Sequence, residues 1–551
     1  MTNKLVLFDS DSLKNFHKRI FFSILIFIFF FSTAIYRISD LMIHPIENSK
    51  KDVLLKKEKR GEIFDRNGNL LAASITSSSL AANPLKIKDK LHIAKILSNI
   101  LHIDEKIIFN KLSSEKKFVW IKRNITPREH QKIVDIGEIN LRIHKENKRI
   151  YPYQNIISHV VGYVNIDQKG QSGIERSFNK DLEVSKNINL TIDINLQQAV
   201  REKLKKTIEI YRAESGLAVI MDLSNGHILS SVSYPDFNPN KKISSFDEKK
   251  LINRVIQSNY EMGSTFKPLT VAMGFDKDII NPNMKFDVTK KIKGIGDYNE
   301  YDGDGIYDVK KIITESSNIG TAQIAKLIGK NNQIEFFKKI GFYNKVNIEL
   351  LEAAEPLGNK NHWGKVETMT IGYGHGFAIT PLHLIKAYAS IANKGKEVNP
   401  TIINKLNNYE QNNIIVKENT SEYFLHLLRS VVTETKFTGP RVKIDGYHLG
   451  GKTGTTVLTN ETGGYYKNRD LTSFISVFPI NNPRYVVLTV VEFPKKIKGS
   501  QQKTTGAVVN APLIKGIILE MIKILNLPKS KSKNFLKADI NKFYNKQYVS
   551  L

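Results

Sequence analysis

The longest apolar stretch of the chain lies near its beginning and predicts a membrane helix. Ile20 to Tyr36 is almost continuous in Phe, Ile and Leu, and a hydrocarbon core about 30 Å thick needs roughly 20 apolar residues as helix. With Ile38 and Leu41 included, the stretch predicts an uncleaved anchor over residues 20–41. A cleaved signal peptide is the alternative, but the apolar run is longer than a usual signal core.

Positive charges beside this stretch predict its orientation. Lys14, His17, Lys18 and Arg19 precede it, and basic residues next to a membrane helix favour the cytoplasmic side. Residues 1–19 are therefore expected to be a cytoplasmic tail, and everything after the anchor is expected to lie outside the cytoplasm.

Short apolar runs separated by turn residues predict two β-hairpins far apart in the sequence. Residues 216–222 and 227–233 are joined through Asn225-Gly226, a strong hairpin signal, and residues 472–478 and 485–491 form a second pair. The pattern between them is mostly helical, including 381–392. Strands at both ends with helices between them predict an α+β fold whose sheet is completed by distant segments.

The region between the anchor and the first hairpin changes pattern often. Asn67-Gly68 predicts a hairpin turn, and residues 93–101 predict a helix. A strand that leads into a helix at residues 190–200 marks a domain start near residue 186. The expected organisation is an N-terminal domain over 42–185, a larger domain over 186–528 and a basic tail over 529–551.

Composition narrows the function classes. The 551 residues exceed what one hydrophobic core supports, and the formal charge is +28. Because Lys is scattered along the whole chain, we expect no nucleic-acid binding, although a basic surface favours anionic membranes and polymers. The absence of Cys excludes disulfides, thiolate catalysis and Cys-ligated metals.

Three short motifs of polar residues follow one another within the larger domain. Ser264-Thr265-Phe266-Lys267 places a hydroxyl and an amine one helical turn apart. The Ser-x-x-Lys spacing recurs at five other places, but only this copy is followed by Ser316-Ser317-Asn318 and then by Lys452-Thr453-Gly454-Thr455. Order and spacing together make these motifs far more specific than any one of them.

The residue types suit acyl transfer by an activated serine. Serine is a weak nucleophile that needs an adjacent base, and Lys267 can take the proton of Ser264 only if its own pKa is lowered. Burial or a second nearby cation would do this, and Lys452 would supply that cation if the third motif lines the same cleft.

The remaining motif residues suit substrate binding and proton transfer. Gly454 would let a substrate backbone approach an edge strand, and Thr453 and Thr455 would offer hydroxyls to a terminal carboxylate. Ser316 could pass a proton to the leaving amine, and Asn318 could hold an amide of the substrate.

The sequence around these motifs resembles the class B penicillin-binding proteins. Residues 260–268, Tyr-Glu-Met-Gly-Ser-Thr-Phe-Lys-Pro, are similar to the nucleophile segment of that family. The resemblance spans nearly the whole chain. Residues 60–72, 149–152, 159–163 and 170–175 look like the family's N-terminal pedestal module. Residues 372–376 with 380–381 look like a loop that leads into a helix in the same transpeptidases.

The resemblance implies a fold and a reaction. It implies a penicillin-binding/β-lactamase-like transpeptidase domain, an antiparallel sheet flanked by helices, after a pedestal domain and one transmembrane helix. Ser264 would attack the penultimate D-Ala carbonyl of a peptidoglycan stem peptide, with the backbone N–H groups of Ser264 and Thr455 as the oxyanion hole. The chain would bind β-lactams and need no metal or cofactor. Thr456 stands where many relatives carry Ala.

The same resemblance implies a place in the cell. The chain looks most like the septal (FtsI-type) branch, with division proteins and a SEDS-family glycosyltransferase as expected partners. The catalytic domain would then be periplasmic, on a single-pass inner-membrane protein at the septum. The alternatives are the elongation branch of the lateral wall and a catalytically idle division scaffold.

Other interpretations fit the residues less well. A β-lactamase would be smaller and would need a carboxylate to activate water. A bifunctional enzyme would need a glycosyltransferase module, and a penicillin-sensing receptor would need more membrane spans. His375, between glycines, is interpreted as positional rather than as a base, and residues 302–305 as a polar turn rather than a calcium loop.

Overall fold

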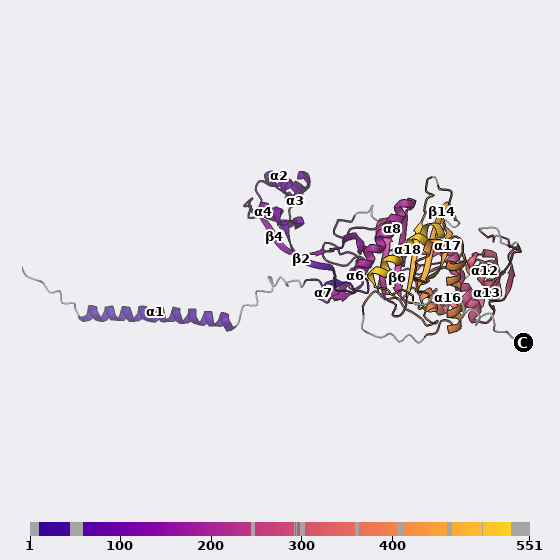
Figure 1. Cartoon of the computed structure of the whole chain (residues 1–551). Coiled ribbons are helices and arrows are strands. Elements are labelled where there is room, and N and C mark those ends of the chain that lie inside the picture. Colours follow the sequence, from indigo (N-terminus) through magenta and orange to yellow (C-terminus); the bar gives the residue numbers. More distant parts are fainter. Residues whose placement is uncertain are drawn as a thin grey trace, which may run out of the picture. The chain divides into compact units, whose positions relative to one another are not determined.

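The computed structural model divides into two compact units, residues 1–58 and 59–551, which are described separately (Figure 1). It describes residues 10–43, 59–243, 248–290, 292–293, 295–297, 303–358, 363–404, 413–459, 465–498 and 500–530. The predicted basic tail over 529–551 therefore lies almost entirely outside the described residues.

The described residues of the first unit form one helix, α1 (Ser10–Ile43). Its segment Lys14–Asp40 is long and apolar enough to cross a membrane, and the predicted anchor lies within the helix. The helix begins at Ser10, ahead of the apolar run, so the second half of the predicted polar tail is helical and continuous with the anchor.

The second unit opens with a five-stranded sheet that we call the pedestal sheet. It consists of β1 (Ile63–Phe64), β2 (Leu70–Ala82), β3 (Val119–Ile125), β4 (Leu141–Ile150) and β5 (Ile188–Asn189). The predicted hairpin turn at Asn67-Gly68 joins β1 to β2, and it is confirmed. The Asp65 carboxylate closes this turn by accepting hydrogen bonds from the backbone of Asn67 and Asn69, each 2.8 Å long.

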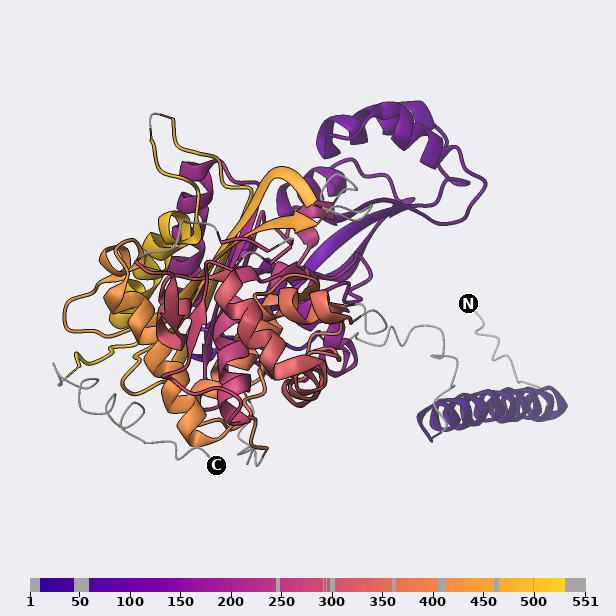
Figure 2. The ribbon, with the colours of Figure 1, turned by 90° about the vertical axis from the view of Figure 1, so that its right-hand side faces the viewer.

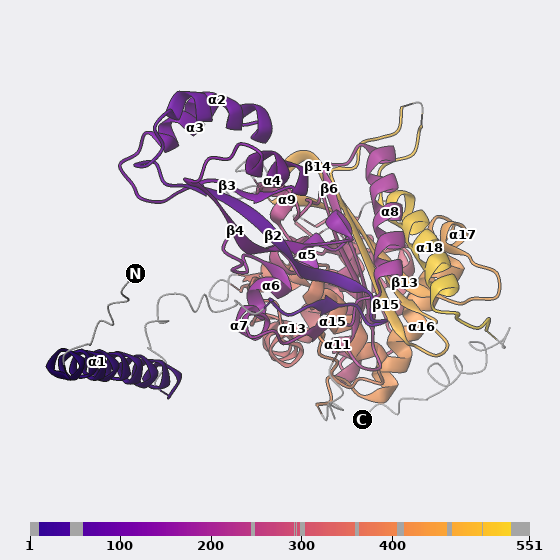
Figure 3. The ribbon, with the colours of Figure 1, turned by 90° about the vertical axis from the view of Figure 1, so that its left-hand side faces the viewer.

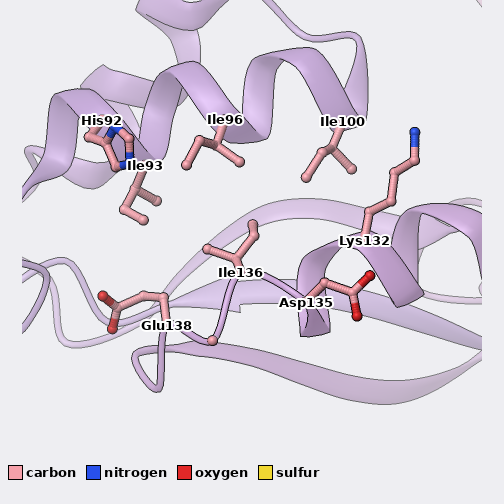
Figure 4. A pocket seen from close by; sticks show the side chains of 9 residues that line it. His92, Ile93, Ile96, Ile100, Lys132, Asp135, Ile136 and Glu138 are labelled. Carbon is pink, nitrogen blue, oxygen red and sulfur yellow. The ribbon is translucent and has the colours of Figure 1, made fainter.

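The outer part of β2 and β4 carries a small head, residues 83–140, with its own apolar core. It contains α2 (Lys90–Leu101), α3 (Glu105–Leu112) and α4 (Pro127–Val134), so the predicted helix over 93–101 is confirmed. A shallow groove of about 530 Å³ lies on the head, with three isoleucines of α2 facing Ile136 (Figure 4). None of the predicted site residues lines this groove.

Segments distant in sequence meet at one buried carboxylate, that of Glu175. Arg60 and Arg149 each donate from Nε to Glu175, at 2.6 and 2.7 Å. Glu175 belongs to α6 (Gly173–Ser177), beside η2 (Gln154–Ile156), α5 (Ser158–Val161) and α7 (Asn179–Glu183). The segments that contain Arg60, Arg149 and Glu175 are three of those on which the family resemblance depends.

The larger domain is built on a five-stranded antiparallel sheet. Its strand order is β13 (Gly450–Thr459), β14 (Tyr465–Phe478), β15 (Tyr485–Glu492), β6 (Ser215–Asp222) and β7 (Ile228–Tyr234). Both predicted hairpins are confirmed, and they join through the pairing of β15 with β6. The third motif lies on β13, which is an edge strand of this sheet.

Helices cover both faces of this sheet, because its strands are apolar on both sides. Leu217 and Val219 face one core, and Ala218 and Ile220 face the other. On the second face lie α8 (Ile194–Tyr211), α17 (Thr438–Val442) and α18 (Gly506–Ile524) (Figure 3).

The opposite face carries the helices that form the site, seen from the other side in Figure 2. They include α11 (Lys267–Asp276), α13 (Asn318–Ile340), α15 (Pro381–Ala392) and α16 (Glu418–Glu434); α15 has the predicted bounds. The shorter elements are α9 (Glu248–Leu251), α10 (Arg254–Gln257), β8 (Tyr260–Glu261), η4 (Gly263–Phe266), β9 (Lys285–Asp287), β10 (Ile306–Asp308), α12 (Val309–Thr314), β11 (Leu357–Gly358), α14 (Lys365–Gly372) and β12 (Phe377–Ile379).

The boundary predicted near residue 186 stays a prediction. The strand that follows it, β5, pairs in parallel with β1 of the pedestal sheet, and α8 then packs against β6 and β7 of the larger domain. One apolar core includes Ile63 of the pedestal and Leu217 of the larger domain, so the two predicted domains are packed together.

Candidate active site

The first motif lies on a tight turn at the start of a helix. Gly263, with φ +52°, opens η4, and Pro268 occupies the second position of α11, where no backbone donor is needed. Ser264 is half-buried and Lys267, one turn later, is fully buried. The local sequence therefore presents the hydroxyl at the surface and the amine inside.

The second motif lies just before α13. Ser317 caps this helix by accepting a hydrogen bond from the backbone of Gly320 at 3.0 Å. Ser316 precedes the cap in a left-handed conformation, φ +60°. The strained backbone turns the hydroxyl of Ser316 away from the helix and toward the two lysines of the other motifs.

The structure brings the three motifs together at the Ser316 hydroxyl. Lys452 Nζ, from β13, lies 2.9 Å from Ser316 Oγ, and Lys267 Nζ lies 3.2 Å from the same oxygen. Lys267 also donates to the Ser316 carbonyl. Among the described residues, neither hydrogen bond of Lys267 goes to Ser264, so the resting contacts connect the motifs through Ser316.

Burial lowers the pKa values of both lysines, and the charge of Lys452 lowers that of Lys267 further. Desolvation is the largest cause for Lys267, followed by the charge of Lys452, and together they hold its pKa well below the ordinary value despite Asp297. Burial lowers the pKa of Lys452 to about 7, against a smaller opposing effect of Glu315. These are the two causes that the sequence predicts for Lys267, and both favour the neutral amine, which is the form that can act as a base.

Gly454 lets β13 approach the nucleophile turn closely. A Cβ there would lie 2.5 Å from Ser473 Oγ and 3.2 Å from the Met262 carbonyl. The glycine therefore has a packing role within the chain, and its expected role toward a substrate backbone stays a prediction. Thr453 and Thr455 are half-buried on the same strand. Thr455 Oγ1 accepts a hydrogen bond from Gly506 at 3.1 Å, which leaves its own proton available.

Asn318 and Asp297 form contacts that the sequence did not predict. Asn318 Nδ2 donates to the Gly296 carbonyl at 2.8 Å, so one amide proton of the residue expected to hold substrate is already used. The Asp297 carboxylate accepts from Ser317 Oγ at 2.7 Å, from the backbone of Ile319 at 3.1 Å and from the backbone of Asn318. No local pattern identifies Asp297, because its partners follow about 20 residues later.

A glycine-rich loop, residues 373–376, supports the nucleophile turn. Gly374, with φ +90°, accepts a hydrogen bond from the backbone of Gly263 at 3.1 Å. His375 Nε2 lies 3.3 Å from Thr456 Oγ1. Burial, and then the charge of Lys267, lowers the pKa of His375 to about 4, so its imidazole is neutral at pH 7.

No group of three or more His, Asp or Glu side chains in the described part of the chain could hold a metal ion. The acidic turn over 302–305 contains Asp302, which lies outside the described residues. The arrangement around Ser264 supplies a serine, two amines with lowered pKa values and a hydroxyl between them, which is sufficient for acyl transfer to and from the serine.

Comparison with known proteins identifies the family. Residues 216–515 match the penicillin binding protein transpeptidase domain, and residues 56–216 match the penicillin-binding protein dimerisation domain. The chain therefore belongs to the penicillin-binding protein transpeptidases, in the class B order of a dimerisation domain followed by a transpeptidase domain. The predicted α+β fold, with its pedestal and N-terminal helix, is confirmed.

Individual relatives cover almost the whole chain. The probable peptidoglycan D,D-transpeptidase PenA of Neisseria meningitidis is 29% identical over 505 residues, covering 86% of this chain and 85% of the relative. The peptidoglycan D,D-transpeptidase FtsI of Escherichia coli is 26% identical over 508 residues, covering 85% and 84%. A peptidoglycan synthetase of Bifidobacterium adolescentis shares the fold, with a TM-score of 0.67 at 21% identity and coverage of 87% and 97%.

Proposed function

We propose that this chain is a serine D,D-transpeptidase that cross-links peptidoglycan stem peptides through an acyl-enzyme on Ser264 during septal wall synthesis. The observation that carries the proposal is the convergence of Lys267, Ser316 and Lys452 beside the nucleophile turn. Relatives named peptidoglycan D,D-transpeptidase FtsI and PenA support the substrate class.

Acylation begins when Lys267, as a neutral amine, takes the proton of Ser264 while Ser264 Oγ attacks the penultimate D-Ala carbonyl carbon. The backbone N–H groups of Ser264 and Thr455 bind the oxygen that becomes negative. Removing one such donor from an oxyanion hole typically costs about 3–4 kcal/mol of barrier.

The tetrahedral intermediate then breaks its C–N bond. The leaving amine of the terminal D-Ala takes a proton that reaches it through the Ser316 hydroxyl, which lies within hydrogen-bond distance of both lysines. Lys267 supplies this proton, so the amine is neutral again when the acyl-enzyme has formed.

Cross-linking reverses these roles. An amine of a neighbouring stem peptide attacks the ester carbon and loses its proton to Lys267, and Ser264 recovers a proton as the new amide bond forms. The products are a cross-linked peptide and the free enzyme. A β-lactam would stop at the ester, because its leaving nitrogen stays attached to the acyl group.

Residues on β13 and before α13 would bind the substrate. Lys452 and the hydroxyls of Thr453 and Thr455 suit the terminal carboxylate, with Gly454 between them on the edge strand of the sheet. The remaining amide proton and the amide oxygen of Asn318 suit a peptide group of the stem.

The cellular role rests on similarity and on the N-terminal helix. The FtsI relatives favour the septal branch, and α1 suits a single-pass inner-membrane protein with a periplasmic catalytic domain. A SEDS-family glycosyltransferase and division proteins are the expected partners. The elongation branch is the second candidate: loss of a septal enzyme should give filaments, and loss of an elongation enzyme should give rounded cells.

A labelled penicillin tests the chemistry. The full-length chain, in detergent, is incubated with the label, and the adduct is located by peptide mass. One adduct on Ser264, absent in Ser264→Ala, supports the proposal. No adduct refutes it and favours the idle scaffold, whereas an adduct that persists in Ser264→Ala refutes Ser264 as the nucleophile.

A further inference from the structure

The loop over residues 373–376 touches the nucleophile turn directly. Gly263 donates its backbone N–H to the Gly374 carbonyl at 3.1 Å, and Gly376 donates its own to Glu261 Oε1 at 2.9 Å. A Cβ on Gly374 would come within 2.2 Å of the Gly263 carbonyl oxygen. The loop therefore lies against one side of the turn with no space between them.

Strand β13 lies against the other side of the same turn. A Cβ on Gly263 would lie 3.3 Å from Thr456 Cβ and 3.5 Å from the Thr455 carbonyl oxygen. A Cβ on Gly454 would likewise lie 3.2 Å from the Met262 carbonyl oxygen. The residue that precedes the nucleophile is thus held between the loop and the strand that carries the third motif.

One side-chain hydrogen bond joins these two supports. Thr456 Oγ1 lies 3.3 Å from His375 Nε2, closer than its other neighbour, the Val457 carbonyl at 3.5 Å. Thr456 is 5% exposed, so water does not readily replace this contact. A neutral imidazole nitrogen can pair with a hydroxyl as donor or as acceptor, and His375 is neutral because burial lowers its pKa to about 4.

We propose that Thr456 and His375 are positioning residues whose hydroxyl–imidazole link fastens the loop over 373–376 to β13 around the nucleophile turn. The link keeps the backbone N–H groups of Ser264 and Thr455 directed at one point, where the oxyanion forms. The inference rests on the proposed function, because it assigns these residues to the same acylation step.

The test separates rate from binding. Acylation of the full-length chain by a labelled penicillin is followed at saturating and subsaturating label, which gives a limiting rate and an apparent dissociation constant. In Thr456→Val the limiting rate should fall about 3- to 10-fold, the effect of one hydrogen bond, with the dissociation constant within about twofold of the parent. Thr456→Ser, which keeps the hydroxyl, should restore the rate.

A matched control removes a comparable hydroxyl elsewhere. Thr472 Oγ1, on the neighbouring strand β14, donates to the Val491 carbonyl at 3.3 Å and is fully buried. Thr472→Val should keep the parental limiting rate. A fall equal to that of Thr456→Val would show a general effect of packing and would overturn the proposal.

A double variant tests the coupling between the two side chains. Since Thr456→Val and His375→Phe break the same link, the double variant should be no slower than the slower single variant. His375→Gln, which can still pair with the hydroxyl, should be faster than His375→Phe. If His375→Phe does not fold, the Val and Ser variants of Thr456 decide the question.

The outcomes distinguish the two proposals. A parent chain without label on Ser264 refutes the proposed function, and this inference with it. If the parent is labelled on Ser264, three results refute only the link between Thr456 and His375. These are a parental rate in Thr456→Val, a rate in Thr456→Ser as low as that in Thr456→Val, and single effects that multiply in the double variant.

Discussion

Two buried sites in this protein each gather two basic side chains, and they differ in the group that lies between these side chains. In the pedestal, Glu175 lies between Arg60 and Arg149 and pairs with both at 2.6–2.7 Å. In the transpeptidase domain, the Ser316 hydroxyl lies between Lys267 and Lys452 at 3.2 and 2.9 Å. Neither lysine forms an ion pair within the described part of the chain.

The group between the two basic side chains decides whether the site is structural or reactive. A guanidinium stays protonated in proteins, and its planar set of N–H donors matches the geometry of a carboxylate. The pedestal site is therefore a permanent link between distant segments. An amine without a paired carboxylate loses its proton when it is buried, and the charge of a second amine helps. The transpeptidase site therefore yields a base, and the pedestal site yields a fixed connection.

Removing the buried amine should have the largest effect on rate. Lys267→Met keeps the length and the apolar surroundings of the side chain but removes the base, so the acylation rate should fall about 10²- to 10⁴-fold. Stability should stay equal or rise, because folding no longer has to desolvate an amine whose pKa is lowered by burial. The checks are labelled-penicillin kinetics and denaturant unfolding, and a rate within tenfold of the parent would refute the role of Lys267.

Breaking the pedestal link should show the opposite pattern. Glu175→Gln leaves two buried guanidiniums without their carboxylate, so the free energy of unfolding should fall by about 3–5 kcal/mol. Acylation per folded molecule should remain at the parental rate. Denaturant unfolding and active-site titration measure the two quantities. An unchanged stability would contradict the assignment of Glu175 as a structural anchor.

Replacing Asp297, which lies near the lysine site, should change the pKa of Lys267. Asp297 raises the pKa of Lys267 and accepts hydrogen bonds from the segment after Ser316. In Asp297→Asn the pKa of Lys267 should fall further, which moves the acid limb of the pH–rate profile to lower pH. The maximal rate should fall about tenfold or less, as one charged hydrogen-bonding group is lost. An acid limb that moves to higher pH would refute this electrostatic role.

The sequence predicted those parts of the molecule that depend on local signals. Hairpins with Asn-Gly turns, and the helix that begins at Pro381, follow from residues within a few positions of each other. The three motifs could be associated because order and spacing identify them jointly. That the motifs meet at the Ser316 hydroxyl could not be derived from the sequence, because the hydrogen bond between Lys452 and Ser316 joins residues 136 positions apart.

The missed features are all contacts between distant segments. Asp297 supports the second motif from a loop that precedes it by about 20 residues, and no local rule requires an acid there. Gly454 was expected to make room for substrate, whereas its nearest neighbours are Ser473 and Met262 of the chain itself. Such contacts depend on how edge strand β13 is placed against the nucleophile turn, which only the folded structure specifies.

The pH dependence of acylation tests whether two buried lysines, neither of which forms an ion pair within the described residues, activate Ser264. As pH falls, protonation of Lys267 removes the base, so the rate should be lost at a pH far below the ordinary lysine value of 10.5. As pH rises past about 7, Lys452 loses the charge that suits a carboxylate, so binding should weaken. We expect a bell-shaped profile with its maximum near neutral pH, and its apparent pKa values belong to the pair of lysines rather than to either one. A rate that rises only as an ordinary lysine titrates, toward pH 10.5, would contradict it.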